Sequence, residues 1–142
     1  MHSVSKATPR QLTNEELADL AEFRAALRNF LAFSEQVAAA QGATTQWYQA
    51  LLVIKTFHSN EPITIGALAR QLMIRDHSAT ELVSRLVRAK LVQRKSDPAD
   101  GRRSHLHITA RGERILSTLA LAHLERLREF RKAFLKPFKV EK

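Results

Sequence analysis

"LVQRKSDPADGRRSHLHIT", residues 91–109, decides the fold because the periodicity of the chain changes within it. The two ends, "LVQRK" and "HLHIT", are short runs of the strand type. Between them lies "SDPADGRRS", residues 96–104, which contains the turn formers Asp, Pro and Gly and includes Arg102 and Arg103. We therefore predict a β-hairpin whose long basic tip meets something negatively charged and narrow.

Helical periodicity precedes the hairpin. Apolar residues recur at helical spacing from Asn14 to about Ala40, and a second helix is predicted from Thr44 or Thr45 to about Phe57. After a very short extended piece at Ile63, two short helices follow in tandem. Thr64 can cap the first of them, and the second has its apolar stripe between Ala79 and Val87.

A last helix follows the hairpin. Thr109 can cap it, and its apolar face continues until Pro137, with a break considered near His123. The order is therefore helices, tandem helix pair, hairpin and helix. We expect a mainly α fold with a small β-hairpin wing, that is, a winged helix-turn-helix with N- and C-terminal helices outside it.

Length and composition exclude several classes of protein. The 142 residues, 44% of them apolar, are enough for one domain with its own core. The absence of cysteine excludes a disulfide framework, a thiolate zinc site and a thiol nucleophile. No export signal and no apolar run long enough to span a membrane is present, so we expect a soluble, cytoplasmic protein with no membrane partner.

The net charge of +9 is concentrated around the hairpin. Residues 85–114 hold nine basic and three acidic residues, which is two thirds of the excess. Such a local concentration is the footprint of a polyanion contact. A solvated basic surface would give the same composition, so charge alone leaves both interpretations open.

The polar face of the fourth helix favours double-stranded DNA as the partner. A tandem helix pair can place its second helix in the major groove, while an adjacent arm reaches the narrower minor groove. The seven residues that we expect to contact bases and phosphates are His77, Ser78, Thr80, Glu81, Ser84, Arg85 and Arg88. On an extended arm, Arg103 would point to the opposite side from Arg102 and contact mainly phosphates.

Residues 63–112, "ITIGALARQLMIRDHSATELVSRLVRAKLVQRKSDPADGRRSHLHITARG", resemble the winged helix-turn-helix of the MarR family of bacterial transcription regulators. The most diagnostic part is D-x-R, here Asp100 to Arg102, followed by apolar-Thr-x-x-Gly, here Ile108, Thr109 and Gly112. The resemblance implies that Arg102 enters the minor groove and that Asp100 helps to hold it. It also implies an obligate homodimer joined through the N- and C-terminal helices.

The resemblance sets the expected organisation and function. Residues 1–13 would be a flexible segment and 14–142 a single domain, with the winged helix-turn-helix at about 44–112 and dimerisation helices at about 14–41 and 110–136. The implied function is that of a sequence-specific regulator, a repressor, that binds an inverted-repeat operator. The alternative is a winged-helix module whose basic wing binds an acidic protein, because one fold serves both roles.

Two positions depart from the family pattern. Lys90 stands where a glycine usually precedes the wing, which puts a left-handed helix end in doubt. Arg75 stands where many members place a capping serine before the recognition helix. Asp76 could cap this helix instead, or Ser78 and Glu81 could form a capping box.

Other side chains give weaker signals. His105 and His107 share a strand face but lack a local acidic or cysteine partner, so we predict no metal site and no cofactor. Neither a G-x-S-x-G elbow nor an H-E-x-x-H helix is present, and we predict no catalytic residues. Four aromatic residues are candidates for lining a pocket for a small aromatic effector, although core packing also explains them: Phe30, Phe33, Trp47 and Tyr48.

Overall fold

The structure is a computed structural model that describes residues 10–57, 61–96, 99 and 101–138. Its elements are, in chain order, α1 (Asn14–Ala40), α2 (Thr45–Thr56), α3 (Ile65–Leu72), α4 (Asp76–Arg88), β1 (Val92–Ser96), β2 (Ser104–Ile108), α5 (Ala110–Leu135) and the short 3₁₀ helix η1 (Lys136–Phe138). The mainly helical fold with a hairpin wing confirms the predicted fold class. Asp100 and Pro98, which belong to the stretch predicted as the wing tip, lie outside the described residues.

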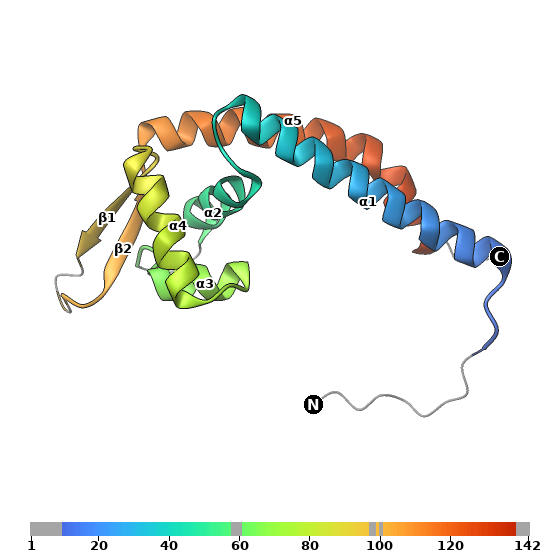
Figure 1. The fold of residues 1–142 in the computed structure, drawn as a ribbon, viewed down its shortest axis with the longest axis horizontal. Helices are drawn as coiled ribbons and strands as arrows, with labels where there is room; N and C mark the ends of the chain where they lie inside the picture. The colour runs from blue at the N-terminus through green and yellow to red at the C-terminus, as the bar shows by residue number, and fades with distance from the viewer. Residues whose placement is uncertain (1–9, 58–60, 97–98, 100, 139–142) are drawn as a thin grey trace.

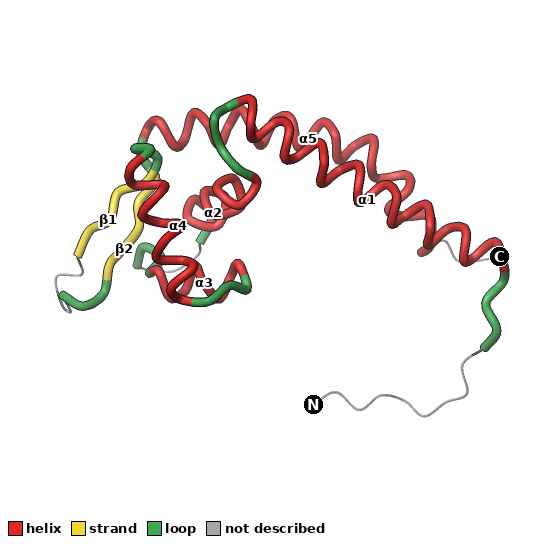
Figure 2. The backbone as a smooth tube through the Cα atoms, viewed as in Figure 1, coloured by secondary structure: helices red, strands yellow, loops and turns green. Residues whose placement is uncertain are grey.

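The molecule consists of an arm and a lobe. Helices α1 and α5 lie side by side and antiparallel to form the arm, while α2, α3, α4 and the hairpin form the lobe at one end (Figure 1). The hairpin projects from the lobe at the end farthest from the tip of the arm, as the tube in Figure 2 shows. In the part of the chain that the structure describes, no helix has the length and apolarity needed to cross a membrane.

Threonine side chains begin four of the helices. Thr13, Thr44, Thr64 and Thr109 precede α1, α2, α3 and α5, and each hydroxyl oxygen accepts a hydrogen bond from the backbone N–H three residues later. Such caps satisfy N–H groups that have no partner within the helix. The structure therefore selects Thr44 over Thr45 for α2, and α5 continues unbroken through His123.

Helix α4 begins without a side-chain cap, so both caps proposed for it are wrong. Its N-cap residue is Arg75, whose side chain makes no capping hydrogen bond, and Asp76 is already the first helical residue. A capping box at Ser78 would require this residue to lie outside the helix. The Ala79 N–H already donates to the Arg75 carbonyl oxygen at 3.0 Å, so the helix is established before that point.

Helix α4 keeps a left-handed end despite Lys90. Lys90 adopts φ 64°, its N–H donates to the Val87 carbonyl, and the Leu91 N–H donates to the Leu86 carbonyl. This is the Schellman arrangement that usually carries glycine. Lysine therefore takes the conformation that glycine would favour, and the chain still turns sharply into β1.

The core of the lobe joins the tandem helices to the hairpin. Leu51, Leu68, Leu82, Leu86 and Leu106 are among its fully buried side chains. The strands pair antiparallel with Val92 opposite Ile108 and Ser96 opposite Ser104. The Leu106 N–H also donates to the Ile63 carbonyl at 2.9 Å, which confirms the short extended piece before α3 and holds β2 against the lobe.

Aromatic rings join the two helices of the arm, and an ion pair joins η1 to α1. Phe23 and Phe30 of α1 contact Phe130 of α5 with ring centroids 6.5 and 5.4 Å apart, and Lys136 Nζ lies 2.5 Å from Glu22 Oε2. Aromatic contact at these separations stabilises the pairing beyond simple burial. The arm is therefore held together over a long stretch of both helices.

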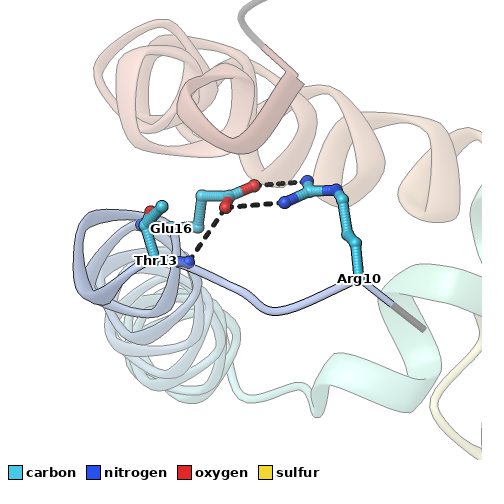
Figure 3. Close-up of polar contacts among 3 residues, drawn as sticks. All are labelled: Arg10, Thr13 and Glu16. Carbon is cyan, nitrogen blue, oxygen red and sulfur yellow. Dashed lines mark hydrogen bonds and ion pairs between the residues drawn. The ribbon is translucent and has the colours of Figure 1, made fainter.

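At the start of α1, Thr13 and Glu16 form a complete capping box, and Arg10 binds the same carboxylate with both terminal nitrogens (Figure 3). The Arg10 hydrogen bonds, together with the Thr13 N–H, lower the pKa of Glu16 to about 2. The carboxylate is therefore charged over the ordinary pH range and fixes the first turn of the arm.

Candidate nucleic-acid interface

The wing and the recognition helix α4 lie against each other. Arg94 of β1 donates from Nη2 to the Ser84 hydroxyl of α4 at 3.4 Å, a long hydrogen bond. Ser84 in turn donates to the Thr80 carbonyl at 3.0 Å, one turn earlier in the helix. The strand that leads into the wing tip is thereby tied to the polar face of α4.

Helix α4 separates an apolar face from a polar one, as expected. Ala79, Leu82, Val83 and Leu86 are buried. On the other side His77, Thr80, Glu81, Arg85 and Arg88 are exposed, and Ser78 and Ser84 are half-buried. The structure thus leaves the polar face of this helix accessible to a partner.

Two of the hydroxyl groups of this face, those of Thr80 and Ser84, donate their protons within the helix. Thr80 Oγ1 donates to the Asp76 carbonyl at 3.0 Å, and Ser84 makes the equivalent bond to Thr80. Both hydroxyl oxygens retain lone pairs that can accept hydrogen bonds. Toward a partner these two side chains can therefore act as acceptors without disturbing the helix.

A polar cleft of about 400 Å³ opens between α3, α4 and the wing. Its lining residues are Thr64, Ile65, Gly66, Arg70, Thr80, Arg102, Arg103 and Ser104. Arg102 and Arg103 therefore face the same cleft, and the expectation that Arg103 points to the opposite side is wrong. The expectation assumed an extended arm, whereas residues 101–102 form a turn, in which successive side chains need not alternate.

Several residues of this surface were not expected from the sequence, and three of them bear on its charge and shape. Arg70 and Gly66 line the cleft from α3, and Arg94 approaches α4 from β1. Arg70 lies four residues after Gly66, so both stand on one face of α3, and this spacing was the signal available in the sequence. Asp100, the predicted partner of Arg102, lies outside the described residues.

The candidate effector residues gather around a buried histidine. The ring of Tyr48 stacks on His123 at 4.2 Å, and Phe30 and Phe33 present their rings to it edge-on at 6.0 and 5.9 Å. Trp47 instead packs against the core of the lobe. Three of the four aromatic residues therefore contact the same ring, that of His123, where the arm joins the lobe.

The two histidines of β2, His105 and His107, are less exposed than most residues of the polar face of α4. His105 is 8% exposed, while His107 stands opposite Gln93 in the hairpin. Desolvation, followed by the charges of Lys95 and His105, lowers the pKa of His107. Among the described residues, no three His, Asp or Glu side chains are placed to hold a metal ion together.

The tandem helices α3 and α4, the hairpin wing and the flanking helices together define a winged helix-turn-helix protein. A sequence profile described as the MarR family matches residues 41–103. An uncharacterised HTH-type transcriptional regulator of Bacillus subtilis, YsmB, is 33% identical over 72 residues, which are 51% of this chain and 49% of that protein. The chain thus aligns with about half the length of this curated relative.

Solved structures share the fold. The MepR–DNA complex of S. aureus superposes with a TM-score of 0.70 at 20% identity, over 86% of this chain and 85% of that one. AbsC of Streptomyces coelicolor, a MarR family transcriptional regulator, gives 0.69 at 21% identity, over 86% and 82%. Residues 41–103 thus match the MarR family, and the chain shares its fold with AbsC and MepR. YsmB and AbsC are both described as transcriptional regulators.

Proposed function

We propose that this protein is a sequence-specific DNA-binding transcription regulator, a repressor, that binds an inverted-repeat operator as a homodimer. The observation that carries the proposal is that Thr80 of α4 and Arg102 and Arg103 of the wing line one open cleft. The helix suited to the major groove and the tip suited to the minor groove therefore face the same side. The fold shared with MepR, whose structure was determined with DNA, supports this reading.

The residues of α4 divide into two roles in this proposal. His77, Ser78, Thr80 and Glu81, in the first half of the helix, read base edges in the major groove. The second half of the helix contacts the phosphate backbone through Ser84, Arg85 and Arg88. The arginine charges bind the phosphates of every DNA sequence alike. In the wing, Arg102 enters the minor groove, where the negative potential is concentrated, and Asp100 restrains it.

The arm supplies the dimer contact. Leu17, Leu20 and Leu31 of α1 are between 45% and 49% exposed, and Leu121, Leu124 and Leu127 of α5 are between 42% and 59% exposed. Such a set of exposed leucines marks an interaction surface rather than an ordinary solvent face. A second copy of the chain that covers these residues would give the two-fold symmetry that an inverted repeat requires.

The proposal includes a small aromatic effector that acts where the arm meets the lobe. Tyr48, Phe30 and Phe33 surround His123 there, so a ligand ring that displaced one of them would shift the lobe relative to the dimer contact. Titration with benzoate tests this, because Trp47 is the single tryptophan and precedes Tyr48 in α2, so displacement of Tyr48 should change its fluorescence. The protein would act in the cytoplasm, where the chromosome of a bacterium lies.

Selection of bound fragments from random duplex DNA tests the function. The expected result is a site with two-fold symmetry whose half-sites are roughly 34 Å apart, one helical turn of DNA. With the selected site, Arg88→Ala should weaken binding to all sequences and reduce the slope of log affinity against log salt by about 0.9. Glu81→Gln should instead change the preferred bases.

A control variant and an alternative partner complete the test. Arg24→Ala removes the same charge from the exposed surface of α1 and should leave both the slope and the sequence preference unchanged. Enrichment of no duplex, together with binding of the wing to a polyglutamate peptide, would favour the acidic-protein alternative. A best site without two-fold symmetry would contradict the dimeric mode of binding.

A further inference from the structure

A buried histidine ring joins the arm to the lobe. His123 of α5 is 4% exposed, and its ring stacks on that of Tyr48 of α2 with the centroids 4.2 Å apart and the planes at 16°. Ser34 of α1, itself 3% exposed, has its hydroxyl oxygen 2.7 Å from His123 Nε2. Helices α1 and α5 of the arm and helix α2 of the lobe therefore meet on one imidazole.

Both nitrogens of this imidazole have partners within the protein. Nδ1 lies 2.6 Å from the Leu119 carbonyl oxygen, which can only accept, so Nδ1 donates, and in the neutral ring Nε2 accepts from the Ser34 hydroxyl. Rotation of the ring would break these bonds and leave buried polar atoms without partners, which is unfavourable. The plane of the ring is therefore fixed relative to α1 and α5. A phenylalanine ring would fill a similar volume without this constraint.

Aromatic rings of α1 hold the imidazole from other directions. The ring centroids of Phe30 and Phe33 lie 6.0 and 5.9 Å from that of His123, at interplanar angles of 74° and 67°. The guanidinium carbon of Arg126 lies 4.1 Å from the centroid of Phe33. Edge-to-face and stacked contacts each have a preferred geometry. The direction in which Tyr48 stacks is thus set by residues of the arm.

Helix α2 transmits this constraint to the rest of the lobe. It lies between the arm and α3 and contacts α1, α5 and α3 (Figure 1). Ala50 and Leu51, which follow Tyr48 in α2, are fully buried in the core that also contains Leu82 and Leu86 of α4. Because Tyr48 stacks on a ring of fixed plane, the direction of α2 is fixed. Through the shared core, the direction of α4 relative to the arm is fixed as well.

We propose that His123 is a positioning residue that fixes the direction of the lobe relative to the arm, and thereby the spacing between the two half-sites that a dimer accepts. The inference rests on the proposed function for the dimer and for the DNA. Two lobes held at a defined angle to a shared dimer contact place their recognition helices a defined distance apart. His123 therefore selects the spacing of the half-sites, whereas the polar face of α4 and the wing select their sequence.

Duplexes with altered spacers test this role. The half-sites of the selected operator are kept, and the spacer between them is changed one base pair at a time. The wild type should bind one spacing roughly tenfold more tightly than its neighbours, since an added base pair moves a half-site by about 3.4 Å along the duplex. His123→Phe should bind the preferred spacing severalfold more weakly and the neighbouring spacings about as well, which flattens the profile. Ser34→Ala, which removes the donor to Nε2, should flatten it in the same direction.

Ile63→Val is the control for a loss of stability alone. Ile63 is 1% exposed in the core of the lobe, and its carbonyl oxygen accepts from the Leu106 N–H of β2 rather than from the arm. This variant should lower the melting temperature and leave the ratio of affinities between spacings unchanged. A purely structural role of His123 would give the same result. A His123→Phe profile parallel to that of the wild type would therefore overturn the positioning role.

Imidazole in solution provides a rescue experiment. His123→Ala opens a cavity between Ser34 and Tyr48, and added imidazole that binds there should raise the melting temperature and sharpen the spacing profile. Pyrrole has a similar size and an N–H donor but no acceptor nitrogen, so it should raise the melting temperature less and leave the profile flat. Equal effects of imidazole and pyrrole would overturn the role of the Ser34 hydrogen bond in orienting the ring.

Residual dipolar couplings of the backbone amides measure the orientation of the lobe without DNA. His123→Phe should change the couplings of α3 and α4 relative to those of α1, and Ile63→Val should leave them as in the wild type. Failure of the wild type to bind any duplex would overturn the proposed function, and these couplings would still test the positioning role. Unchanged couplings in His123→Phe would overturn the inference that His123 orients the lobe.

Discussion

The hydroxyl of Thr109 donates a hydrogen bond to the carbonyl oxygen of Lys90, 2.7 Å away, and so joins the end of α4 to the start of α5. The same hydroxyl oxygen accepts from the Gly112 N–H at 3.0 Å, and the Thr109 N–H donates to the Leu91 carbonyl at 3.0 Å. These bonds connect Lys90 and Leu91, which follow the recognition helix α4, to Thr109 at the start of α5. The left-handed conformation of Lys90 is therefore imposed by its surroundings rather than by its own preference.

Lys90→Gly should stabilise the protein by about 0.5–1 kcal/mol, because glycine adopts φ 64° without the steric penalty of a Cβ atom. Urea denaturation measures this change. Ala89→Gly is the matched control, since Ala89 has φ −77° in the right-handed region and glycine there should destabilise by a similar amount. Equal effects of the two substitutions would show that Lys90 carries no backbone strain.

Gly112→Ala should destabilise the protein by about 2 kcal/mol or more. A Cβ atom at Gly112 would lie 2.3 Å from the Leu91 carbonyl oxygen and 2.8 Å from Ile108 Cγ1, so the backbone at the end of α4 would have to move. Gly101→Ala is the control, because a Cβ there meets nothing within 4 Å. Both variants are compared by thermal and urea unfolding, and similar midpoints would contradict the close contact.

These positions also show what the sequence could predict. Periodicity and threonine caps predicted the five α-helices and the hairpin, though not the short η1, because those signals are local and the core follows them. The motif apolar-Thr-x-x-Gly identified Thr109 and Gly112. The contacts that explain the motif, to the carbonyl oxygens of Lys90 and Leu91, come from residues about twenty positions earlier and could not be read from the spacing.

Sequence reasoning failed where a property depends on tertiary context. The start of α4 has no side-chain cap because its N-cap residue is Arg75, whose guanidinium cannot accept a hydrogen bond. Arg103 was assigned to the wrong side because the chain turns at residues 101–102. Arg70 was overlooked because only the folded chain brings α3 opposite the wing.

Ser34→Ala should destabilise the protein by about 1–3 kcal/mol. His123 Nδ1 lies 2.6 Å from the Leu119 carbonyl oxygen, which can only accept, so Nδ1 carries a proton, and in the neutral ring Nε2 then accepts from the Ser34 hydroxyl at 2.7 Å. The alanine variant leaves Nε2 buried with no donor. In a His123→Phe background the same change should have almost no effect, and a double-mutant cycle that shows simple additivity would contradict the coupling.

Acid should destabilise the protein partly through His107. Its pKa is lowered in the folded state from 6.5, so the unfolded chain takes up the proton first as the pH falls. The destabilising contribution of His107 is therefore absent well above pH 6.5, and the free energy of unfolding decreases as the pH falls below this value. His107→Gln should reduce this decrease in urea unfolding between about pH 7 and 5, whereas His77→Gln, on the exposed face of α4, serves as the control. An identical pH profile for His107→Gln and the wild type would contradict the shift.

The apolar surface of α5 predicts a second copy of the chain as its partner. Leu124 and Leu127 border an apolar cleft of about 510 Å³ that also includes Phe130 and Phe134. Leu124→Glu would place a carboxylate in this surface, and burial of an unpaired charge in a dimer contact is unfavourable by several kcal/mol. Because Leu124 is 52% exposed in the single chain, the fold itself should tolerate the substitution.

Sedimentation velocity at micromolar concentration distinguishes the two effects. We expect a dimer for the wild type, a monomer with an unchanged far-UV spectrum for Leu124→Glu, and loss of operator affinity because one monomer presents one recognition helix. Thr118→Glu adds the same charge to α5 six residues earlier, about two thirds of a turn around the helix, and should stay dimeric. A Leu124→Glu protein that remains a dimer and binds DNA normally would show that this face is not the contact between copies.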